Sequence, residues 1–120
     1  MKSYRELRVW QLSVDLAVEI CLLLENFPKH ELFGICSQLR RCAVSIPSNI
    51  AEGHQRDSTR EFLKHLSIAC GSLAELETQL LISERLGYLK PEKFSDFTAR
   101  LQELGRMING LQNSLRRKLD

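Results

Sequence analysis

The sequence of 120 residues has little of what marks an enzyme or a membrane protein. It has no glycine-rich phosphate loop, no serine in a nucleophile elbow and no cysteine pair at zinc-site spacing. Glu61 and His65 are four residues apart, whereas metal-binding helical bundles repeat Glu-x-x-His pairs on two helices. No run approaches the ~20 apolar residues that a membrane span needs. These absences predict a protein without catalytic residues, metal or other cofactor, and without a membrane partner.

The sequence also shows no disulfide framework and no secretory signal. Its four cysteines contain no C-x-x-C pair and fall mostly among helix-periodic apolar residues, which predicts reduced thiols in or near a core. The first ten residues read MKSYRELRVW, without the apolar segment of a secretory signal. We therefore expect a cytoplasmic protein.

What the sequence does contain fits one globular domain. A chain of this length buries roughly 65% of its extended surface on folding, which is enough for a single hydrophobic core and too little for two. Hydrophobic residues at 43% and charged residues at 27% lie near the averages of globular proteins. We predict one domain that spans residues 1–120.

Apolar residues recur at steps of three and four in four segments, the spacing that aligns side chains along one face of a helix. The four stripes run over residues 10–27, 32–50, 62–80 and 94–115. No alternation typical of strands competes with them. Because the connections are short, consecutive helices are expected to lie antiparallel. The predicted fold is all-α, an up-down-up-down four-helix bundle.

Proline and glycine predict the limits of the first two helices. The residue before a proline is pushed out of the helical region, so Pro28 sets the end of the first helix. Pro47 interrupts the second stripe, and we expect helix two to be kinked there. Gly53 is a typical stop signal and is expected to end this helix.

The third and fourth helices carry similar signals. Ser58 and Glu61 have the spacing of a capping box, so the third helix is expected to begin there. Gly87 closes it, and Pro91 suits the first turn of the fourth helix. Gly71 lies inside the third helix at a cost of about 1 kcal/mol relative to alanine. We expect it to let a neighbouring backbone approach closely.

Beyond the four stripes, the first and third helices carry additional apolar residues. These are Leu12, Leu16, Leu23, Leu63, Cys70 and Leu81. One interpretation is that a wide apolar face packs on the bundle core, because core-facing helices use three or four positions in two turns. The other is that a monomer leaves these residues partly in water and a homo-oligomer covers them. Our hypothesis is the homo-oligomer, although the sequence leaves both interpretations open.

Positive charge gathers in two regions, although the net charge is only +2. Residues 38–65, which we call the basic elbow, carry five Lys or Arg against three Asp or Glu. A second cluster, residues 116–118, fits the end of a helix, where cations complement the macrodipole. Arginine binds phosphate through a planar fork of donors. We predict that the basic elbow binds nucleic acid through Arg40, Arg41, Arg56, Arg60 and Lys64.

Two features refine this prediction. Arg41 shares a polar helix face with Ser45, and an alternative is that it pairs with a carboxylate of the third helix, Glu75 or Glu77. Aromatic residues that stack bases are sparse in the elbow, where Phe62 belongs to an apolar stripe. The predicted contacts are therefore to phosphates, with strong salt dependence and little sequence preference.

The pattern as a whole resembles a known family. The motifs that carry the resemblance are LRVWQLSVDLAVEI at residues 7–20, FPKHE at 27–31, QLRRCAVSIPSNIAEG at 38–53 and GSLAELETQLLIS at 71–83. They are similar to those of the four-helix bundle proteins encoded in 23S ribosomal RNA intervening sequences, a family that also includes the accessory variability proteins of diversity-generating retroelements. The similarity covers the chain from Leu7 to about Leu115.

The resemblance carries expectations about assembly and partners. It implies a bacterial cytosolic protein without enzymatic activity, built as an antiparallel four-helix bundle and assembled as a ring-like homopentamer. In the retroelement branch it implies nucleic-acid binding and a reverse transcriptase partner. Together with the basic elbow, it leads us to predict a non-enzymatic, oligomeric accessory protein that binds RNA or DNA. The alternative is a homo-oligomeric protein-interaction scaffold with no nucleic-acid role.

Overall fold

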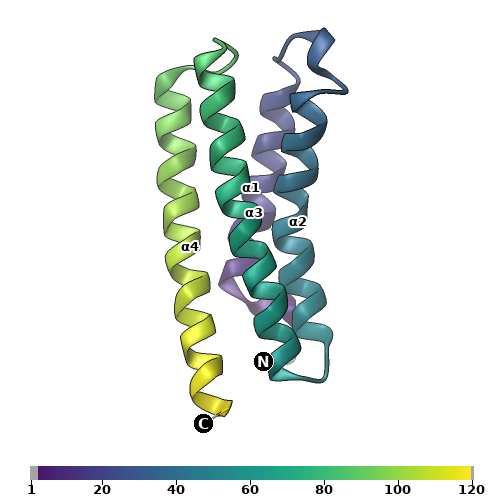
Figure 1. Ribbon diagram of the computed structural model, residues 1–120, viewed down its shortest axis with the longest axis vertical. Helices are drawn as coiled ribbons and strands as arrows, with labels where there is room; N and C mark the ends of the chain where they lie inside the picture. The colour runs from purple at the N-terminus through teal and green to yellow at the C-terminus, as the bar shows by residue number, and fades with distance from the viewer. Residues whose placement is uncertain (1–2, 120) are drawn as a thin grey trace.

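The computed structural model describes residues 3–119, and within them four α-helices pack together and no strand occurs (Figure 1). The helices are α1 (Arg8–Leu24), α2 (Ile35–Gln55), α3 (Thr59–Arg85) and α4 (Pro91–Leu119), and two short 3-10 helices are η1 (Tyr4–Glu6) and η2 (Lys29–Glu31). The molecule is elongated, with extents of 48 × 23 × 20 Å. Figure 1 shows the α2–α3 turn and the end of α4 at one end of the long axis, and η2 and the α3–α4 turn at the other. The prediction of an all-α fold with four helices is confirmed.

The second helix differs most from its predicted limits. It begins at Ile35, so Leu32 lies in the preceding turn and is exposed instead of belonging to the apolar stripe. It also continues without a break through Pro47 and ends at Gln55, two residues beyond the predicted stop at Gly53. Proline inside a helix costs about 3 kcal/mol. Burial of Ile46, Pro47 and neighbouring side chains against the bundle keeps the segment helical despite that cost.

The predicted limits of the third and fourth helices are confirmed. Ser58 Oγ accepts a hydrogen bond from the Glu61 backbone N–H at 3.2 Å, which caps the first turn of α3. Gly87 follows the end of α3 with a φ of +81°, a conformation that favours glycine. Pro91 is the first residue of α4.

The apolar stripes meet in one core that runs along the bundle. Its most deeply buried residues come from all four helices, with Ile20 on α1, Leu39 on α2, Leu66 on α3 and Ile108 on α4. Of the additional apolar residues, Leu16 is buried within the protomer, so its expected exposure was wrong. The other five are partly buried, and four of them pack against the core, namely Leu12, Leu23, Leu63 and Cys70.

Glycine positions show where the helices approach most closely. A methyl group at Gly71 would meet no atom within 4 Å, so this glycine faces open space and the expected close approach within the protomer is wrong. At Gly53 a methyl group would lie 2.6 Å from His65 Cβ and 3.1 Å from Phe62 Cδ1. The tight contact between α2 and α3 therefore lies at the end of α2, next to the turn that joins them.

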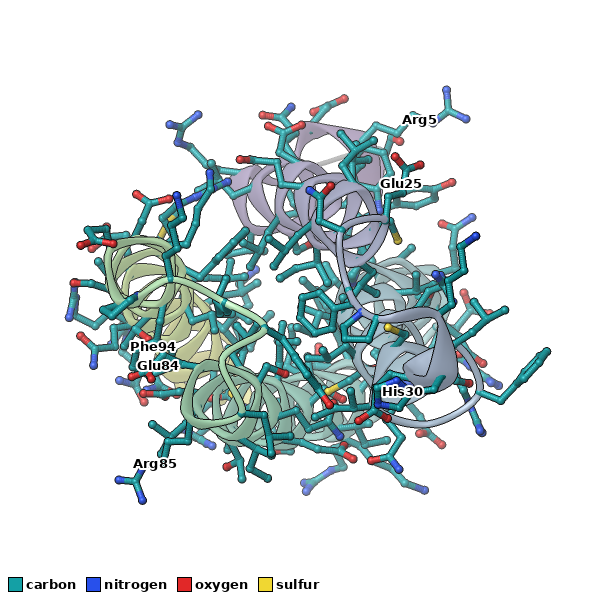
Figure 2. All side chains as sticks on the ribbon, turned by 90° about the horizontal axis from the view of Figure 1, so that it is seen from above. Arg5, Glu25, His30, Glu84, Arg85 and Phe94 are labelled. Carbon is teal, nitrogen blue, oxygen red and sulfur yellow. The ribbon has the colours of Figure 1, made fainter. Side chains whose placement is uncertain are left out.

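Polar contacts fix the remaining elements. Arg100 on α4 donates hydrogen bonds to both carboxylate oxygens of Glu19 on α1, and these bonds lower the pKa of Glu19. At the end that holds η2, Tyr88 donates to Glu31 Oε2 at 2.8 Å, which raises the pKa of Tyr88 and ties the α3–α4 turn to η2. Figure 2 looks down the bundle from this end.

None of the helices in the described part of the chain has an apolar stretch long enough to cross a lipid bilayer.

Candidate nucleic-acid interface

The structure divides the five predicted nucleic-acid-binding residues into two groups. Arg40 and Arg41 lie in the second turn of α2, whereas Arg56 follows its last residue. Arg56 is fifteen positions after Arg41, which corresponds to about 22 Å along the helix axis. The arginine pair and Arg56 therefore lie near opposite ends of α2, and the single basic elbow expected from the sequence is not formed.

Arg41 lies on a polar groove between α2 and α3. The groove has a volume of about 430 Å³ and is lined by Gln38, Arg41, Cys42, Ser45, Ser72 and Glu75. Ser45 Oγ donates to Ser72 Oγ at 2.7 Å, which joins the two helices across it. Arg41 is exposed and takes part in none of the ion pairs found in residues 3–119, so the alternative pairing with Glu75 or Glu77 is not formed.

The carboxylate in this groove has other neighbours. Glu75 Oε2 accepts a hydrogen bond from Gln79 at 3.3 Å, and Glu75 Oε1 lies 3.7 Å from Cys42 Sγ. Burial, and then the charge of Glu75, raise the pKa of Cys42 to about 12. The thiol is therefore protonated at neutral pH and donates to the Ser72 carbonyl at 3.0 Å. This arrangement is a structural contact between α2 and α3.

The other predicted cations gather around the α2–α3 turn. Arg56 lies in the turn, and Arg60 and Lys64 lie on the first two turns of α3. All three side chains are exposed. Arg56 pairs with Glu52 at 3.1 Å, with both side chains more than half exposed, whereas Arg60 and Lys64 make no ion pair with any other described residue. An exposed pair of this kind contributes about 0–1 kcal/mol, so Arg56 exchanges Glu52 for a phosphate at little cost.

The cluster at residues 116–118 lies at the same end of the bundle, as Figure 1 shows for the C-terminal end of α4 and the α2–α3 turn. We call this end the basic end and define it as residues 3–12, 50–64 and 109–119. These segments carry eight Lys or Arg and four Asp or Glu. The remaining described residues carry eight and ten. Positive charge is thus concentrated at one end of the long axis, although the whole chain is nearly neutral.

In the sequence these two clusters are far apart and look independent of each other. The signal that connects them is the order of the helices, because the ends of the second and fourth helices of an up-down bundle fall at the same end. At the start of the chain, Arg5 adds a cation that extends away from the bundle into solvent (Figure 2). The basic end therefore draws cations from three separate parts of the sequence.

The histidines of this region serve packing. His65 is partly buried, and its Nδ1 lies 3.0 Å from Asn49 Oδ1 on α2. The His54 ring meets the Phe62 ring edge-on, with centroids 5.6 Å apart. No group of three or more His, Cys, Asp or Glu side chains within residues 3–119 is arranged to hold a metal ion.

Comparisons with known proteins agree with this architecture. A family model described as 23S rRNA-intervening sequence protein matches residues 5–110. Among solved structures, the chain is similar to a protein with unknown function from the S23 ribosomal protein family of Bacteroides thetaiotaomicron, at 25% identity and a TM-score of 0.80. The similarity covers 88% of this chain and 95% of that one. A search of curated proteins found no match.

Proposed function

This chain belongs to the family of 23S rRNA-intervening sequence proteins. We propose that it is a non-enzymatic, oligomeric protein that binds RNA through contacts to the RNA phosphates. The contacts come from Arg56, Arg60 and Lys64, assisted by the cations of residues 116–118. The observation that carries the proposal is the charge of the basic end, eight cations against four acids on a chain whose net charge is +2. Arg40 and Arg41 form a second, smaller contact about 22 Å away.

The physics of such a surface determines how it recognises nucleic acid. Each phosphate that a Lys or Arg neutralises releases counterions, so affinity depends on salt and little on sequence. The positive charge at one end orients the bundle, because a polyanion attracts that end more strongly than the rest of the molecule. An antiparallel bundle of this length then stands end-on to the nucleic acid instead of lying along it.

Exposed apolar residues support the oligomeric part of the proposal. Val18, Leu22 and Val44 are between 44% and 57% exposed and border an apolar groove of about 360 Å³ between α1 and α2. A second copy that covers this groove removes these side chains from water. The resemblance implies a ring-like homopentamer, and a ring forms when unlike faces of successive protomers make such a contact. The ring would bring several basic ends to the same side.

The second candidate function is a protein-interaction scaffold, and one residue favours it. Phe33 is 92% exposed in the segment between η2 and α2, at the opposite end from the basic end. A fully exposed aromatic side chain is the kind of residue that anchors a protein interface. In this alternative the protein recruits a partner at that end and never contacts nucleic acid.

A binding titration separates the two candidates. A labelled structured RNA is titrated with the protein at about 50 mM and about 200 mM salt, the range over which phosphate contacts weaken markedly. We expect binding at the lower concentration and, for about three phosphate contacts, a loss of roughly tenfold or more at the higher one. Absence of binding at low salt would favour the scaffold and contradict the proposed function.

A further inference from the structure

A cavity of about 420 Å³ opens at the basic end, between the α2–α3 turn and the last turns of α4. We call it the end cavity. Its apolar wall consists of Leu7, Phe62, Leu111 and Leu115. This volume lies within the range of about 300–1,000 Å³ that small-molecule sites occupy. The cavity therefore has room for a ligand larger than an ion.

Charged groups of both signs lie on the same cavity. Arg56 and Lys118 line it from two different elements, and Asp57 lines it from the turn. His54 also lines it, and its Nδ1 is buried without a hydrogen-bond partner among the described residues. An apolar wall with two cations and one carboxylate suits a ligand that is partly flat and apolar, partly anionic and partly hydroxylated.

We propose that the end cavity binds one unpaired ribonucleotide of an RNA strand, an inference that rests on the proposed function. The base lies against the apolar wall, to which Leu111 and Leu115 of α4 and Phe62 of α3 contribute. The phosphate is held between Arg56 and Lys118, and Arg56 leaves its exposed pair with Glu52 to do so.

Asp57 gives the cavity its preference for RNA. A carboxylate beside a phosphate is repulsive, so this residue works against a simple anion such as inorganic phosphate. It is an acceptor for the hydroxyl groups of a sugar, and the 2′-hydroxyl is the group that distinguishes RNA from DNA at a given site. The combination of Asp57 with Arg56 and Lys118 thus favours a whole ribonucleotide over a free phosphate or a deoxyribonucleotide.

Two RNA duplexes test the inference. One is fully paired, and the other has the same sequence with one additional unpaired nucleotide in the middle of one strand. We expect both to bind through phosphate contacts and the second to bind about tenfold more tightly, since it alone places a nucleotide in the cavity. Replacing the ribose of the unpaired nucleotide by deoxyribose is expected to remove most of that preference, and Asp57→Ala, which removes the acceptor for the 2′-hydroxyl, should make the two sugars equivalent.

Matched variants locate the effect. Lys118→Ala should abolish the preference for the unpaired nucleotide, whereas Arg117→Ala removes a neighbouring exposed cation that does not line the cavity and should preserve it. Equal binding of the two duplexes by the wild-type protein would overturn the cavity assignment and leave the phosphate-binding function standing. Equal loss of preference in both variants would also overturn it. If neither duplex binds to the wild-type protein, the proposed function itself is overturned.

Discussion

Replacing Arg56, Arg60 and Lys64 together by alanine is expected to weaken RNA binding by on the order of 100-fold at low salt and to reduce the slope of affinity against salt by about 2. The physical reason is the loss of three cations that lie on one end of the bundle and of which only Arg56 has an acidic partner among the described residues. All three side chains are exposed, so the fold should be unaffected. Fluorescence anisotropy with a labelled structured RNA, at several salt concentrations, gives both quantities.

A triple variant at the other end is the control for net charge. Arg85, Lys90 and Lys93 are exposed and lie at the end of α3, in the following turn and at the start of α4. Their replacement by alanine changes the charge of the protein by the same amount but leaves the basic end intact, and Arg85 in Figure 2 points outward from this opposite end. A large loss of affinity in both triple variants would show that binding follows net charge alone and would contradict the assignment to the basic end.

Substituting alanine for two glycines should change stability in opposite directions. Gly53→Ala places a methyl group 2.6 Å from His65 Cβ, so α2 and α3 must separate near the turn that carries the cations. Overpacking against a side-chain Cβ, which cannot move aside, costs about 3 kcal/mol, and the higher helix propensity of alanine offsets about 1 kcal/mol of this, so we expect a net loss of about 2 kcal/mol. Gly71→Ala has identical chemistry in open space and should stabilise the protein by about 1 kcal/mol.

Urea unfolding followed by circular dichroism measures both changes at one protein concentration, because assembly makes stability depend on concentration. The comparison also tests the proposed oligomer. If Gly71→Ala is strongly destabilising, another chain packs on that face of α3, and the small residue serves the contact between protomers. If Gly53→Ala is as stable as the wild-type protein, the close approach of α2 to α3 is wrong.

The helical pattern of the sequence predicts much of the fold because it follows from local chemistry. A cap such as Ser58, a glycine with positive φ such as Gly87 and a proline at a first turn such as Pro91 act within a few residues of themselves. Pro47 is different, because the burial of the residues around it offsets the free-energy cost of a proline inside a helix. Whether such burial prevails depends on the other helices, which the local sequence does not reveal.

The candidate site was harder to predict for the same reason. Arg40 and Arg41 lie near the start of the 21-residue helix α2, at the opposite end from Arg56. Only three of the five predicted residues therefore lie together. The contribution of residues 116–118 and of Phe62 to the basic end depends on which helix ends meet in space. Charge, in contrast, was visible in the sequence, since both basic clusters stand out against a nearly neutral chain.

Hydrogen–deuterium exchange of the full chain, with and without a structured RNA, tests the central claim most directly. We expect RNA to slow exchange chiefly in the basic end, residues 3–12, 50–64 and 109–119. Protection confined to the segment around Phe33, or to α2 around Arg40 and Arg41, would contradict it.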